Sequence, residues 1–260
     1  MRGGLVTGAA AALVCLAAAA WLAEALLPPA EEAAPEGAEA LCVRGIAVRE
    51  EQSVYAPEGG SLILAPEGGR VAAGGILAAV SPTREGLLAA AREAAREEPA
   101  VGRSLARAAA YAAASGRAEL AEPFAALWSE EDISGAYELI RSPVSAIWSR
   151  STDALEYLGP EALEGLDGDG LAELMALSAG ESPAAGRLVT GRRWYFAAAL
   201  PAGAAALEGG EALLRIAGRE YPARLVSLNG GAAVFELAGG LEETLYLRFA
   251  DAEIVFQGDR

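Results

Sequence analysis

The amino-acid sequence predicts a mainly β protein with an α-helical hairpin insert, preceded by one transmembrane helix. Three observations lead to this fold class. The chain begins with a long apolar stretch, most of the remainder consists of short β-prone runs between glycine turns, and one central segment has apolar residues at helical spacing. Its 260 residues suffice for one large or two small domains with a hydrophobic core.

The N-terminal stretch Gly3–Ala23 contains no charged residue. At about 1.5 Å per residue it reaches roughly 30 Å, the thickness of the hydrocarbon core of a bilayer. Arg2 precedes the stretch and acidic residues follow it, so residues 1–27 are predicted to be a single-pass anchor in the cell membrane. The N-terminus is then cytoplasmic and the bulk of the chain extracytoplasmic. A cleaved signal peptide and a buried helix of a soluble domain are the alternatives.

The segments after the predicted anchor differ in composition and in the pattern of their apolar residues. Residues 28–42 are rich in proline, alanine and glutamate, which is typical of an extended linker. Residues 43–82 alternate short β-prone runs with glycine pairs and are predicted to form half of a small β-sandwich, whose second half follows at residues 139–166. Residues 185–260 include the hairpin signal Asn229-Gly230 and are predicted to form a small antiparallel β-barrel.

Residues 83–131 are predicted to form the helical insert. Apolar residues recur at helical spacing after Thr83, with arginine and glutamate on the other face. Glu98 and Pro99 interrupt the pattern, and proline suits the first turn of a second helix, which we expect to end at Gly116. The two helices read as a hairpin with arms of about 21–25 Å. The alternative is a small helical bundle that covers a sheet.

Composition excludes several classes of function. The chain has 36 acidic and 20 basic residues, a net charge of −16, and this surface repels phosphate backbones, so no nucleic acid is expected as a partner. The sequence contains no histidine, hence no imidazole base, and no lysine to carry biotin or lipoate. The two cysteines, Cys15 and Cys42, cannot form a four-ligand zinc site. No cofactor and no metal are therefore predicted.

Carboxylates are the remaining candidates for catalysis, because a glycosidase needs only two of them. The acidic pairs that could serve are Glu130-Glu131, Asp167 with Asp169, and Glu242-Glu243. Each pair is interpreted as a solvated loop or strand end. No catalytic, cofactor-binding or metal-binding residue is predicted, and the chain is not expected to be an enzyme.

Two segments carry a family resemblance. Residues 56–80 resemble the first half of the biotinyl/lipoyl-like module in HlyD-type membrane fusion proteins, the periplasmic adaptor subunits. The matching residues are Ala56, Pro57, Gly60, Glu67, Gly68, Val71, Gly74 and Leu77. Residues 142–149 resemble the second half, with Ala146 where the family has glycine. Residues 153–163 resemble a stretch of clostridial adaptor-like proteins, with Ala154 in place of glycine, and the segment around Trp194 resembles the adaptor β-barrel.

The resemblance implies a split lipoyl-like β-sandwich, interrupted by the hairpin and followed by the barrel. It also implies a non-catalytic adaptor of a transport, efflux or secretion system, which forms a homo-oligomer and binds an inner-membrane transporter or another envelope protein. The family continues with another β segment where this chain stops, so we expect a C-terminal truncation. The alternative function is that of an envelope structural or regulatory protein, in division, sporulation or the cell-wall zone, that reuses the fold without transport.

Overall fold

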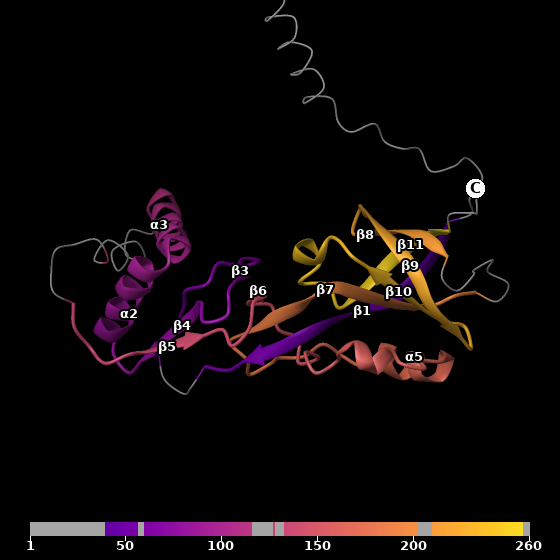
Figure 1. Cartoon of the computed structure of the whole chain (residues 1–260), viewed down its shortest axis with the longest axis horizontal. Helices are drawn as coiled ribbons and strands as arrows, with labels where there is room; N and C mark the ends of the chain where they lie inside the picture. Colours follow the sequence, from indigo (N-terminus) through magenta and orange to yellow (C-terminus); the bar gives the residue numbers. More distant parts are fainter. Residues whose placement is uncertain (1–39, 57–59, 116–126, 128–132, 202–209, 257–260) are drawn as a thin grey trace, which may run out of the picture. The chain divides into compact units, whose positions relative to one another are not determined.

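The computed structural model describes residues 40–56, 60–115, 127, 133–201 and 210–256 (Figure 1). The protein is mainly β, as predicted. Its strands are β1 (Leu41–Val54), β2 (Gly60–Ile63), β3 (Arg70–Val71), β4 (Ile76–Ser81), β5 (Glu138–Arg141), β6 (Ala146–Ser149), β7 (Gly186–Ala199), β8 (Glu211–Ile216), β9 (Arg219–Asn229), β10 (Ala232–Leu237) and β11 (Phe249–Phe256). Its helices are α2 (Arg84–Glu97), α3 (Pro99–Ala114) and α5 (Gly168–Ala176), with 3-10 turns η1 (Pro160–Leu163) and η2 (Leu241–Glu243).

The predicted anchor, residues 1–27, lies outside the described residues. Within the part of the chain that the structure describes, no helix combines the length and the apolar character needed to cross a membrane. Most of the predicted linker is likewise outside. Its last two residues, Leu41 and Cys42, already belong to β1 and pair with β11, because their backbone continues the ladder into the apolar run that follows.

Six strands form a closed ring of antiparallel pairings. The order is β1, β11, β8, β9, β10 and β7, and β7 pairs again with β1. Alternate side chains of each strand fill the interior, as the two-residue repeat of a strand requires. Trp194 and Phe196 of β7 face Phe235 of β10 there, among smaller residues of the other strands.

Strand β1 corrects the prediction for residues 43–55. The sequence pattern suggested two short strands in the first half of the sandwich, but the segment is one strand whose residues pair with β11 and β7. The polar residues Arg49 to Gln52 broke the apolar alternation and concealed its continuity. The register shifts between Arg49 and Glu51, where the strand passes a bulge and continues its pairing with the start of β7.

The strands of the second module come from both sides of the helical insert. Strand β4 lies between β2 and β5 in a three-stranded sheet, and β3 pairs with β6, which continues onto β7. Between these layers lies a core that includes Leu77, Trp148 and Leu188. Residues before position 82 thus pair with residues after position 137, which is the pairing that a split module requires.

Residues 153–180 cover the outer face of the ring, and we call this segment the strap. It contains η1 and α5, which begins at the cap Asp167, whose side chain accepts a hydrogen bond from Gly170. Figure 1 shows α5 beside β1 and β7. Five leucines of the strap are buried against this face, namely Leu155, Leu158, Leu163, Leu166 and Leu171.

Candidate functional site

The helical insert is the first candidate for a contact surface, because the adaptor resemblance implies a protein partner. Helix α2 begins where the sequence indicates, since the Thr83 hydroxyl accepts a hydrogen bond from Gly86 N at 3.1 Å. Glu98 separates the helices and Pro99 opens α3, whose end is capped by the Ser115 hydroxyl donating to Tyr111 O at 2.8 Å. The two predicted helices are therefore present at the expected positions. The rest of the predicted insert, apart from Leu127, lies outside the described residues.

Helix α2 lies across the three-stranded sheet rather than projecting from it. Ala90, Ala91 and Ala94 are fully buried in a core shared with residues of β4. At the far end of the helix, Arg141 of β5 donates to both oxygens of Glu97 at 2.7 and 2.8 Å. The Glu98 carboxylate accepts from Ile76 N at 2.6 Å. For this helix the alternative prediction, a helix that covers a sheet, describes the arrangement, because small alanines let it approach the strands closely.

Helix α3 packs on α2 through Val101 and Leu105, which are buried with Leu127. Its second half is largely exposed, and the Tyr111 side chain is the most accessible large apolar group, with 75% of its surface exposed. This exposed part of α3 is the surface of the described insert that is available to a partner.

The base of the insert is closed by two glycines. A Cβ atom on Gly135 would lie 2.7 Å from Gly86 N, so the backbones entering and leaving the insert cross in direct contact. The Ser81 hydroxyl donates to Ala136 O at 2.7 Å beside the crossing. At Gly135 a side chain would displace main-chain atoms, and at Gly86 a Cβ atom would meet Ser81 Oγ at 2.1 Å and Ala136 O at 2.5 Å.

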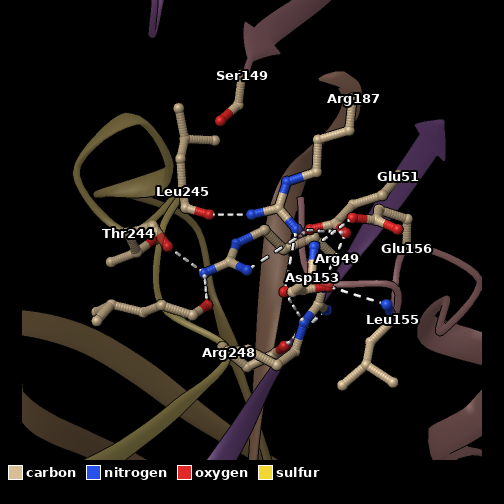
Figure 2. A network of polar contacts seen from close by, with 12 residues as sticks. Arg49, Glu51, Ser149, Asp153, Leu155, Glu156, Arg187, Thr244, Leu245 and Arg248 are labelled. Atoms are coloured by element: carbon tan, nitrogen blue, oxygen red, sulfur yellow. Dashed lines mark hydrogen bonds and ion pairs between the residues drawn. The ribbon is translucent and has the colours of Figure 1, made fainter. Parts of the chain in front are cut away.

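A network of buried polar side chains, which we call the arginine cluster, is shown in Figure 2. It consists of Arg49, Arg187 and Arg248 with the carboxylates of Glu51 and Asp153. Arg248 donates to Glu51 Oε2 at 2.6 Å and to Asp153 Oδ2 at 2.9 Å. Arg187 donates to the same two carboxylates at 3.1 and 3.3 Å. The three arginines are buried, so these contacts compensate charges that water cannot reach.

The cluster also binds the segment between η2 and β11. Arg49 donates to Thr244 O and, at 2.8 Å, to Leu247 O, and Arg187 donates to Leu245 O. Burial lowers the pKa of Arg49 to about 10, opposed by the nearby Glu51, and its guanidinium lies 5.7 Å from the ring centre of Trp194. Arginines bind both carboxylates, and the second oxygen of Glu51, Oε1, is buried without a hydrogen bond at 3.6 Å from Arg49 Nη1. The arginine cluster joins β1, β7, the strap and the segment between η2 and β11.

The acidic pairs weighed as catalytic residues are not brought together. Asp167 caps α5, and the neighbouring Asp169 lies in the first turn of that helix. Glu242 forms an ion pair of 2.9 Å with Arg70, and Glu243 pairs with Arg219. Glu130 and Glu131 lie outside the described residues. In the described ranges no group of three or more metal-ligating side chains is assembled, and Cys42 is exposed.

Sequence reasoning missed the arginine cluster. Its one local signal is alternation: Arg49 is two residues beyond the buried Ala47, so both face the ring interior. Trp194 and Phe196 are fully buried in the ring. Trp148 is also buried, and it packs between the β-layers of the second module.

No protein-family model matches this sequence, and no curated protein matches it. Several solved structures match this chain. ZneB from Cupriavidus metallidurans has 13% identity over 85% of this chain and 99% of its own, with a TM-score of 0.37. The membrane fusion protein Spr0693 from Streptococcus pneumoniae has 14% identity over 85% and 100%, with a TM-score of 0.33. The periplasmic adaptor protein EmrA has 11% identity over 83% and 97%, also at 0.33.

The chain is similar to membrane fusion and periplasmic adaptor proteins, the class that its motifs predicted.

Proposed function

We propose that this chain is a membrane-anchored extracytoplasmic adaptor of a transport, efflux or secretion system, without a catalytic role. The observation that carries the proposal is the split module. Strands before and after the helical insert pair with each other, as β4 does with β5 and β3 with β6. Strands β7 to β11 follow and form a closed ring with β1, which precedes the module. This order is the one that a lipoyl-like sandwich, a helical insert and an adaptor-type β-barrel would produce.

The composition supports a binding role. The module has the shape of a carrier domain, but the chain contains no lysine that could bear biotin or lipoate. The absence of histidine removes the commonest general base. In this proposal residues 1–27 anchor the chain, the described part is extracytoplasmic, and several copies assemble on an inner-membrane transporter or another envelope protein.

A second candidate is an envelope structural or regulatory protein. One observation favours it: α2 lies on its own sheet, fixed by Arg141 and Glu98, so this part of the insert does not reach outward to a distant partner. A protein that stabilises an assembly close to the membrane needs no such reach.

Site-specific photo-crosslinking in native membranes separates the two candidates. A photoreactive amino acid at Tyr111 reports on the exposed part of α3, and one at Tyr246, also an exposed tyrosine but outside the insert, serves as the matched control. For an adaptor we expect Tyr111 to crosslink to a polytopic transporter or to a neighbouring copy. Crosslinks only to division, sporulation or wall-assembly proteins would support the second candidate. Soluble enzymes as the sole products would contradict both.

A further inference from the structure

Among the described residues, the strap is joined to the ring by side-chain contacts and not by strand pairing. Its two ends meet, since Gly180 N donates to Asp153 O at 2.9 Å. Its backbone hydrogen bonds are local, as in Leu158 N to Leu155 O at 3.0 Å and Leu171 N to Asp167 O at 2.9 Å. Among the described residues, the ladders of the ring close without any strand from the strap. The strap can therefore leave the ring without breaking the pairing of its strands.

Two main kinds of contact hold the strap in place, besides a hydrogen bond of 3.4 Å from Asn229 Nδ2 to Gly165 O. The first is apolar: the buried leucines of the strap cover Ile46 and Val48 of β1 and Val234 of β10. The second is the side chain of Asp153, which enters the arginine cluster and binds Arg187 and Arg248 (Figure 2). Asp153 is only 13% exposed, and the neighbouring Glu156 accepts from its backbone N–H at 2.6 Å.

The residue after Asp153 opposes this arrangement. Ala154 has a φ of 62°, in the left-handed region that costs a residue with a Cβ atom free energy. Across this residue Leu155 N donates to Asp153 Oδ1 at 3.0 Å, so the contacts of the Asp153 carboxylate offset the cost of the conformation.

We propose that the strap is a latched cover, which opens as a unit while the ring stays closed, and that Asp153 is its latch. Opening uncovers the apolar face formed by β1, β7 and β10. The inference concerns this chain's own conformations and does not depend on the proposed adaptor role. Local opening of this kind is seen as amide exchange that is faster in one contiguous segment than in the rest of the fold.

Hydrogen–deuterium exchange on the intact chain tests the proposal through three variants. Asp153→Asn removes the charge with little change in size, and we expect strap amides to exchange roughly tenfold to a hundredfold faster while ring amides remain more strongly protected than strap amides. Ala154→Gly relieves the left-handed strain, and we expect roughly fivefold slower exchange in the strap. Glu242→Gln, which removes the exposed ion pair with Arg70, is the control and should alter neither.

Two results would overturn the latched cover. One is strap amides in the unaltered protein that exchange at the rate of the ring amides, since the strap would then open only in global unfolding. The other is an Ala154→Gly strap that exchanges as fast as in the unaltered protein. The second variant keeps the test decisive even if Asp153→Asn destabilises the whole fold.

Discussion

The carboxyl group of Asp153 is held in its charged form. Burial raises its pKa, but the hydrogen bonds and charges of Arg248 and Arg187 outweigh burial and keep the pKa below its ordinary value. A carboxyl whose pKa is lower in the folded chain stabilises the fold at pH values above its unfolded pKa. That stabilisation is lost as the pH falls through the folded pKa. Acid should therefore weaken the cluster.

We expect Asp153→Asn to lower the free energy of unfolding at pH 7 by roughly 2–3 kcal/mol, since buried arginines lose a charged acceptor. The difference from the unaltered protein should begin to shrink as the pH falls below about 4, the pKa of the unfolded carboxyl, and should vanish only below the lower pKa of the folded carboxyl. Thermal unfolding of the variant and the unaltered protein from pH 7 to pH 2 measures the loss of stability at pH 7 and its decrease in acid. A difference that stays constant over this range would contradict the role of the charge.

Ala217 occupies the first position of the two-residue turn between β8 and β9. Its φ is 52° and that of Gly218 is 78°, the values of a type I′ turn, which prefers asparagine followed by glycine. We expect Ala217→Asn to raise the free energy of unfolding by about 0.5–1 kcal/mol. Ala238→Asn, at an exposed position without positive φ, is the control. An equal gain in both variants would show that turn geometry is not the cause.

At the scale of elements, the sequence located the helices better than the strand pairings. Thr83 and Pro99 are local signals, and α2 and α3 begin beside them. The sequence left open whether α2 covers a sheet, because an alanine-rich face suits a neighbouring helix as well as a strand. The full length of β1 was hidden by Arg49, whose guanidinium donates to Thr244 O and Leu247 O, far along the chain.

The glycine crossing at the base of the insert gives a prediction for this element. Gly135→Ala places a Cβ atom within 2.7 Å of the Gly86 backbone, and we expect a loss of about 1–3 kcal/mol in the free energy of unfolding. Gly180→Ala meets nothing within 4 Å and should change it by less than about 0.5 kcal/mol. Urea unfolding of both variants measures the effect. Equal stabilities would mean that the crossing relaxes without cost.

At the scale of the whole molecule, the charge-free segment Gly3–Ala23 predicts one membrane pass with the described part outside the cytoplasm. A reporter that is active only in the cytoplasm, fused after Arg260, should give no signal in cells, whereas the same fusion without residues 1–27 should be active. A strong signal from the full chain would exclude the proposed location and with it the extracytoplasmic adaptor.

Closure of the ring joins β1 to β11, two strands that the ribosome synthesises far apart in time. Strand β11 pairs with β1 and β8, and Arg248 donates to Ala47 O across 201 residues. Until β11 has emerged from the ribosome, β1 and β8 each retain an unpaired edge of the kind at which chains aggregate. A nascent chain in this condition needs a holding chaperone. If it is exported, a translocation channel that threads unfolded polypeptide suits it better than one that carries folded cargo.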